Sequence, residues 1–95
     1  MRIMGLGILS DFCAEHADCR KWIANWISDV RHSQWKTTHD IKERYASASF
    51  LADNIVTFNV RGNEYRLEVR IALRTGIVLV RWMGTHAEYT KRKQT

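Results

Sequence analysis

Three side chains in the last third of the sequence have the chemistry that RNA cleavage requires. Arg66 carries a planar guanidinium whose fork of N–H donors fits a phosphate group. His86 and Tyr89 are spaced so that a helical turn would put both on one side. Cleavage of RNA by its own 2′-hydroxyl needs a base for that hydroxyl, an acid for the departing 5′-oxygen and positive charge on the phosphate. The three residues are therefore candidates for those roles.

Which of His86 and Tyr89 would act as the base, and which as the acid, stays open. Histidine gains and loses a proton near neutral pH, so His86 suits either role. Tyr89 suits the acid as it stands, and it would act as a base only beside arginines, because nearby positive charge favours the phenolate. A histidine that only caps the end of a strand is the alternative interpretation of His86.

Further arginines are expected on the same face of a predicted sheet. In the strand that begins at Tyr65, side chains alternate, so Arg66, Glu68 and Arg70 should point away from the core and line an uncovered surface. Arg81 interrupts the next strand, where an unpaired charge is costly, so it must reach solvent, a ligand or the Glu68 carboxylate. The additional substrate-binding candidates are Arg61, Arg70 and Arg81.

A second group of reactive side chains lies near the start of the sequence, at Cys13, His16 and Cys19. The Cys-x-x-His-x-x-Cys run lacks a fourth ligand at a spacing typical of zinc sites, so we expect no metal and no other cofactor. Two cysteines without a second pair also build no disulfide framework. We interpret both as reduced thiols that pack as small apolar residues, with His16 in the turn between two helices.

The first half of the chain is predicted to be mainly helical. The apolar residues over 1–9 indicate a first strand, and Ser10 with Asp11 would cap a short helix that runs to about His16. Asp18 would cap a second helix. Its apolar residues recur every three or four positions, at Cys19, Trp22, Ile23, Trp26, Ile27 and Val30.

A third short helix is predicted over 40–45, after Thr37 or Thr38 as its cap. The apolar period then changes to two, with alternation over 55–60 and 65–71 that is typical of a hairpin.

The segment 77–83 is apolar on both faces and indicates an interior strand. The whole pattern predicts an α+β fold, a mainly antiparallel sheet with the N-terminal helices packed on one face.

Length and composition limit the number of domains and the kinds of partner that this protein can have. Ninety-five residues with 45% hydrophobic content suit one domain, residues 1–95, with a flexible basic tail from about residue 90. No apolar run approaches the ~20 residues that span a bilayer, so we expect a cytoplasmic protein without a membrane partner. Lysine and arginine number 15 against 10 acidic residues, and ten of those cations are arginine, which suits a phosphate-bearing partner. A surface that only keeps the protein soluble is the alternative interpretation of this charge.

Several sequence blocks between residues 35 and 89 form an ordered set. They are Trp35 with Asp40-Ile41-Lys42, then Ser47-Ala48-Ser49, then Phe58-Asn59-Val60-x-Gly62-Asn63-x-Tyr65-Arg66-Leu67, and finally Gly84-Thr85-His86-Ala87-Glu88-Tyr89. The set resembles the HigB toxin family of the RelE/ParE superfamily, which belongs to type II toxin-antitoxin systems. The helical region before Trp35 matches this family only in pattern.

The resemblance implies a RelE-like fold and a metal-independent endoribonuclease that uses the 2′-hydroxyl as its nucleophile. Such a toxin is an mRNA interferase, which cleaves mRNA on the translating ribosome and stops growth by blocking translation. The implied partners are a HigA-type antitoxin, mRNA and the ribosome. The family's Gly-Asn-x-x-Arg block gives Arg66 a phosphate contact and Asn63 a shaping role. Its Thr-His-x-x-Tyr block makes His86 and Tyr89 the catalytic candidates.

Two other function classes stay open. Superfamily members that inhibit DNA gyrase share the fold without being nucleases, and they have no need of His86 with Tyr89. A non-catalytic RNA-binding module would use the basic face of the sheet. It would lack aromatic side chains there, because Phe58, Tyr65 and Trp82 fall on the apolar register and are assigned to the core.

Overall fold

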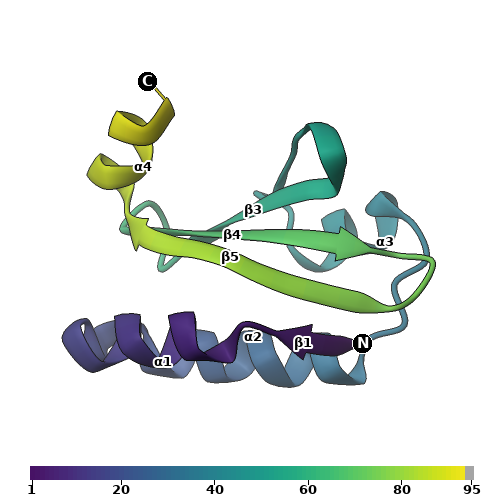
Figure 1. Cartoon of the computed structure of the whole chain (residues 1–95), viewed down its shortest axis with the longest axis horizontal. Helices are drawn as coiled ribbons and strands as arrows, with labels where there is room; N and C mark the ends of the chain where they lie inside the picture. The colour runs from purple at the N-terminus through teal and green to yellow at the C-terminus, as the bar shows by residue number, and fades with distance from the viewer. Residues whose placement is uncertain (94–95) are drawn as a thin grey trace.

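The computed structural model describes residues 1–93 as an α+β fold built on one five-stranded sheet (Figure 1). The strands are β1 (Arg2–Met4), β2 (Ser49–Phe50), β3 (Ile55–Val60), β4 (Tyr65–Ala72) and β5 (Ile77–Thr85). The helices are α1 (Leu6–Glu15), α2 (Arg20–His32), α3 (Thr38–Arg44) and α4 (His86–Lys93). Two short 3-10 helices connect them, η1 (Ala17–Cys19) and η2 (Ala52–Asn54).

The strand order across the sheet is β1-β5-β4-β3-β2. β1 runs parallel to β5, and every other neighbouring pair is antiparallel. The mainly antiparallel sheet and the β3–β4 hairpin are therefore confirmed. β5 lies between β1 and β4, as its apolar pattern predicted for an interior strand.

Helices α1 and α2 cover one face of the sheet, while α4 rises from the end of β5 on the other side (Figure 1). The core lies between the sheet and the α1–α2 layer, where Trp26 packs edge-on against Phe58 with ring centroids 5.6 Å apart. Val30 and Leu67 are fully buried. The apolar stripe predicted for the second helix is confirmed, and it docks on the apolar register of the hairpin.

The predicted first strand over 1–9 is wrong beyond Met4. Gly5 adopts a left-handed φ of 87° and begins α1, so the following apolar residues lie on a helix. Leu9 and Cys13 are buried at a spacing of four, which is a helical period. An added β-carbon on Gly5 would lie 2.7 Å from the Val80 carbonyl oxygen, so the close approach of the chain to β5 also requires glycine.

Asp18 does not cap α2, which begins at Arg20 without a side-chain cap. The Asp18 carboxylate instead accepts hydrogen bonds from side chains of the β3–β4 hairpin, and this tertiary contact replaces the local one. The predicted cap of the third helix is confirmed at Thr37. Its hydroxyl and the Asp40 carboxylate each accept from the other residue's backbone N–H, which forms a capping box.

The end of the described chain is helical. α4 continues through Lys93, so the basic tail expected from about residue 90 begins as a part of this helix, and residues 94–95 lie outside the described part. None of the helices in residues 1–93 combines the length and the apolar character that a bilayer crossing requires.

Candidate active site

The face of the sheet opposite the α1–α2 layer carries the candidate chemistry, and we call it the open face. Register fixes its rows, because paired residues on neighbouring strands point to the same side. Arg66 of β4 pairs with Asn59 of β3 and with Gly84 of β5. The adjacent row consists of Thr57, Glu68 and Trp82. Arg66 therefore lies on the middle of the three strands, between Asn59 and Gly84.

Arg66 is half-buried and only partly satisfied by neighbouring groups. Its Cζ atom lies 5.8 Å from the centroid of the Tyr89 ring, a cation–π contact. Its Nη2 atom donates a long hydrogen bond of 3.5 Å to Oδ1 of Asn63. Within residues 1–93, the buried Nη1 atom has no hydrogen-bond partner. A buried donor left without an acceptor is costly, and an anion such as phosphate that reached this guanidinium would satisfy it.

Helix α4 is anchored at its first residues. The Glu88 backbone N–H donates to Oγ1 of Thr85 at 3.1 Å, and the Thr85 N–H donates to the Glu88 carboxylate at 2.9 Å. This capping box holds the pKa of Glu88 below its ordinary value, chiefly through the Thr85 backbone N–H. The His86 N–H donates to the Glu64 carbonyl at 3.0 Å, which ties the start of α4 to the β3–β4 turn.

The predicted helical turn at His86 is the first turn of α4, so His86 and Tyr89 share one side of that helix. Tyr89 is half-buried against the sheet, with its ring in contact with Arg66 and 6.1 Å from the ring of Trp82. His86 is exposed at the rim. The structure therefore brings Tyr89 and Arg66 into contact and leaves His86 accessible to solvent.

Trp82 lies on the open face, whereas strand alternation assigned it to the core. The cause is a β-bulge, in which Arg81 is an extra residue of β5 between Val80 and Trp82. The Trp82 ring lies across Gly84, where an added β-carbon would be 2.4 Å from ring atom Cζ2. The bulge thus reverses the direction in which the tryptophan points, and the glycine leaves room for its ring.

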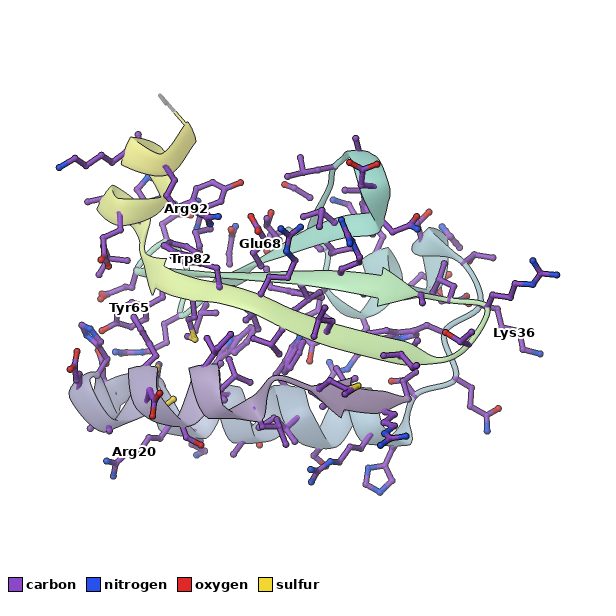
Figure 2. All side chains as sticks on the ribbon, in the orientation of Figure 1. Arg20, Lys36, Tyr65, Glu68, Trp82 and Arg92 are labelled. Carbon is purple, nitrogen blue, oxygen red and sulfur yellow. The ribbon has the colours of Figure 1, made fainter. Side chains whose placement is uncertain are left out.

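Glu68 is not part of an uncovered surface. It is only 6% exposed, because Arg92 of α4 lies over it with Nη1 3.5 Å from Oε1 of the carboxylate. The Arg92 guanidinium also lies 4.4 Å from the centroid of the Trp82 ring. Figure 2 shows these three side chains between the sheet and α4. Of the alternatives for Arg81, the structure shows the exposure to solvent, and the cation beside Glu68 is Arg92.

Arg61 points to the other side of the sheet. Its Nη1 atom lies 2.6 Å from Oδ2 of Asp18 in η1, and the Tyr65 hydroxyl donates to the same carboxylate at 2.8 Å. The Tyr65 hydrogen bond is the largest cause that holds the pKa of Asp18 below its ordinary value. The same bond is the largest cause that raises the pKa of Tyr65 to about 12. The structure does not bring Arg61 together with Arg66.

Arg70 lies on the open face but away from the contact between Arg66 and Tyr89. It is four residues from Arg66 on β4, which corresponds to roughly 13 Å along a strand. Its Nε atom donates to the Asp53 carbonyl at 3.2 Å. Arg70 and Arg81 are both exposed.

Trp82 and Arg92, which pack together beside Tyr89, were not among the candidate residues predicted from the sequence. A register count with period two cannot show a bulge, and Arg92 lay in the segment predicted as a tail. The available signal was Gly84, because an isolated glycine inside a strand often marks a bulge or a close approach. A glycine two positions after a tryptophan leaves space for that ring on their shared face.

The cysteines and the histidine near α1 have structural contacts. Cys13 and Cys19 are buried free thiols with their sulfur atoms 3.4 Å apart. Burial is the main cause that raises the pKa of Cys19 to about 12. The His16 ring stacks on Phe12 with centroids 4.2 Å apart. In the part of the chain that the structure describes, no three His, Cys, Asp or Glu side chains are grouped to hold a metal.

Comparison with known proteins gives one family. A model of the HigB toxin family, described as the RelE-like toxic component of a toxin-antitoxin system, matches residues 19–92. The match covers α2 to α4 and includes Arg66, His86 and Tyr89. No curated protein matches the chain.

Proposed function

Because the chain belongs to the HigB family of RelE-like toxins in toxin-antitoxin systems, we propose that it is an endoribonuclease that cleaves messenger RNA. The observation that carries this proposal is the contact between Arg66 and Tyr89. A half-buried guanidinium with an unpaired Nη1 atom lies against the aromatic ring of a candidate proton donor. That arrangement supplies a phosphate clamp directly beside a group that moves protons.

In the proposed reaction the 2′-oxygen attacks the adjacent phosphorus atom and the bond from phosphorus to the 5′-oxygen breaks. One proton passes from the 2′-hydroxyl to a base, and one passes from an acid to the 5′-oxygen. The products are a 2′,3′-cyclic phosphate and a 5′-hydroxyl. Arg66 binds the phosphate oxygens as they gain charge, while His86 and Tyr89 take the base and acid roles between them. This scheme uses no metal.

The proposed substrate is mRNA on the translating ribosome in the cytoplasm, and cutting it stops growth by blocking translation. Support comes from the net charge of +5 and from exposed arginines beyond the catalytic contact. Asn63 positions Arg66 through its Oδ1 atom, and Arg61, Arg70 and Arg81 contribute to the field that attracts RNA. The family has an antitoxin partner, which we propose is of the HigA type.

The test is a cleavage assay on one defined message with and without translating ribosomes. We expect the wild type to cut, and Arg66→Ala and His86→Ala to cut at least 100-fold more slowly while keeping the wild-type unfolding temperature. Arg31→Ala is the matched control, because Arg31 is an exposed arginine on α2, in the layer opposite the open face. Wild-type rates for folded Arg66→Ala would overturn the proposal. Growth arrest with broken DNA and intact message would favour gyrase inhibition.

A second candidate function has a specific observation in its favour. A non-catalytic RNA-binding module needs aromatic side chains on the basic face, and the structure supplies Trp82 and Tyr89 there. Ultraviolet crosslinking of RNA to this protein, without cleavage in either condition of the assay, would favour that function.

A further inference from the structure

A cavity lies beside Asn59 and Asn63, at the edge of the sheet where β3 extends beyond β2. Its volume is about 470 Å³. Its lining includes aromatic, polar and basic side chains, those of Trp22, Arg44, Tyr45, Ser47, Asn59 and Asn63. We propose that this cavity binds a nucleobase of the RNA whose phosphate binds Arg66, and so sets the base preference. The proposal rests on the proposed function.

The cavity adjoins the candidate active site through two of its lining residues. Asn59 pairs directly with Arg66 across β3 and β4. Asn63 accepts the hydrogen bond from Nη2 of Arg66 at 3.5 Å. Two residues of the cavity wall therefore contact or neighbour the phosphate clamp, so a chain bound through its phosphate at Arg66 can turn a neighbouring base into the cavity.

The wall on the helix side is aromatic. Trp22 of α2 and Tyr45 after α3 are both half-buried, with ring centroids 6.1 Å apart. Trp26 of the same helix is fully buried in the core, whereas Trp22 is only partly buried and packs against the core from its edge. Aromatic faces beside a basic groove are the common platform for unpaired bases. The half-exposed Trp22 ring thus provides a stacking surface.

The wall on the sheet side is polar and available. Within residues 1–93, the Asn59 side-chain amide and the Ser47 hydroxyl make no hydrogen bond to other protein groups. An asparagine amide has a donor and an acceptor side by side, which matches the edge of a nucleobase. Asn63 uses only its oxygen for Arg66, so its NH₂ group also remains a donor.

The rim of the cavity is held in place and positively charged. The Asp29 carboxylate accepts from Nη2 of Arg44 at 2.7 Å and from the Tyr45 hydroxyl at 2.6 Å. The Arg44 side chain is nevertheless 60% exposed, so its charge still reaches a passing phosphate. One cavity therefore has aromatic rings for base stacking, polar groups for the edge of a base and a positive charge for the RNA backbone. Recognition of single-stranded RNA uses this combination.

The first test maps cut sites at nucleotide resolution for the wild type, Asn59→Ala and Ser28→Ala. Asn59→Ala should reduce the base preference at one position near the cut at least fivefold, because the edge-reading amide is lost. Ser28→Ala is the control, since Ser28 is an exposed α2 residue outside the cavity. Identical base frequencies at every position for wild type and Asn59→Ala would overturn the cavity proposal while leaving the nuclease intact.

The second test separates the cavity from cleavage. The labelled protein is titrated with each 5′-nucleoside monophosphate and with ribose 5-phosphate, which lacks a base. Nuclear magnetic resonance then follows the Trp22 indole N–H and the Asn59 side-chain amide. Shifts with nucleotides but not with ribose 5-phosphate support the cavity even if no cleavage is found. Equal shifts with both compounds, or shifts with neither while the enzyme cleaves, would overturn it.

Discussion

The ring of Trp82 occupies the space beside Gly84 that a β-carbon on residue 84 would enter, with ring atom Cη2 2.5 Å from that position. The same ring lies under the Arg92 guanidinium, at 4.4 Å, and 6.1 Å from the Tyr89 ring. Both of those partners belong to α4. The place of the helix that carries the catalytic candidates therefore depends on a glycine in β5.

Replacement of Gly84 by alanine is expected to displace the Trp82 ring and with it the contacts of α4. Gly84→Ala should lower the free energy of unfolding by about 1–3 kcal/mol, because overpacking forces the ring or the backbone to move. Urea denaturation measures the loss. Cleavage should fall as well, since Tyr89 loses its support.

A double-mutant cycle isolates this contact. Trp82→Ala removes the ring, so Gly84→Ala should cost much less in that background than in the wild type. Additive losses of unfolding free energy would show that the two residues do not interact and would contradict the assignment.

The Tyr89 hydroxyl and the Tyr89 ring have separable roles. Tyr89→Phe keeps the ring contacts with Arg66 and Trp82, so the unfolding temperature should stay close to that of the wild type. The loss of a proton-transfer group should slow single-turnover cleavage by about 10²–10⁴-fold. Tyr89→Leu should lose both activity and stability. Full activity in Tyr89→Phe would assign proton transfer to His86 and other groups.

The Thr85 cap is expected to control the order of α4. Thr85→Ala removes the acceptor of the Glu88 N–H bond and should cost about 1 kcal/mol of helix stability, so amide hydrogens of α4 should exchange faster. Thr85→Ser keeps the hydroxyl and serves as the matched control. If both variants exchange alike, the cap does not hold α4.

The hydrogen bond from Tyr65 to Asp18 predicts a stability contribution with two pH limits. The folded pKa of Asp18 lies below 3.8, so the contribution is present above pH 3.8 and is lost as pH falls through the folded value. The folded pKa of Tyr65 is raised from 10.0 to about 12, so the contribution is present below pH 10.0 and is lost as pH rises through about 12.

The measurement compares urea midpoints of the wild type and Tyr65→Phe across pH. The wild type should exceed the variant by a constant amount between about pH 5 and 9, and the difference should shrink at both extremes. Tyr45→Phe is a control, since its hydroxyl donates to Asp29 and not to Asp18. A difference that persists unchanged down to pH 2 would exclude the Asp18 partner.

The sequence allowed the hairpin, the interior strand and the core face to be predicted because alternation over 55–60 and 65–71 is unbroken. It also allowed the helical turn at His86 and the exposed position of Arg70 to be expected. Whether Arg66, His86 and Tyr89 carry out cleavage stays a prediction. Their joint position at one end of the open face follows from strand order, which periodicity alone does not give.

The errors have local physical causes. Arg81 adds one residue to β5 without any change in composition, so the register beyond it reversed and Trp82 was misplaced. Asp18 is of a residue type that often caps helices. Its carboxylate instead accepts hydrogen bonds from Tyr65 and Arg61, which are distant in sequence. The strand β2 has only two residues, too few to show the alternation of a strand, so it was not predicted.

The pairing of β1 with β5 joins the first residues of the chain to segment 77–79. In a growing polypeptide β1 therefore has no partner strand, and α1 has no β5 to pack against, until β5 has been synthesised. His86 and Tyr89 follow β5 directly, so they are translated immediately after it. The strand that completes the pairing of β1 and the catalytic candidates are therefore added in immediate succession, and nascent fragments that end before β5 carry neither.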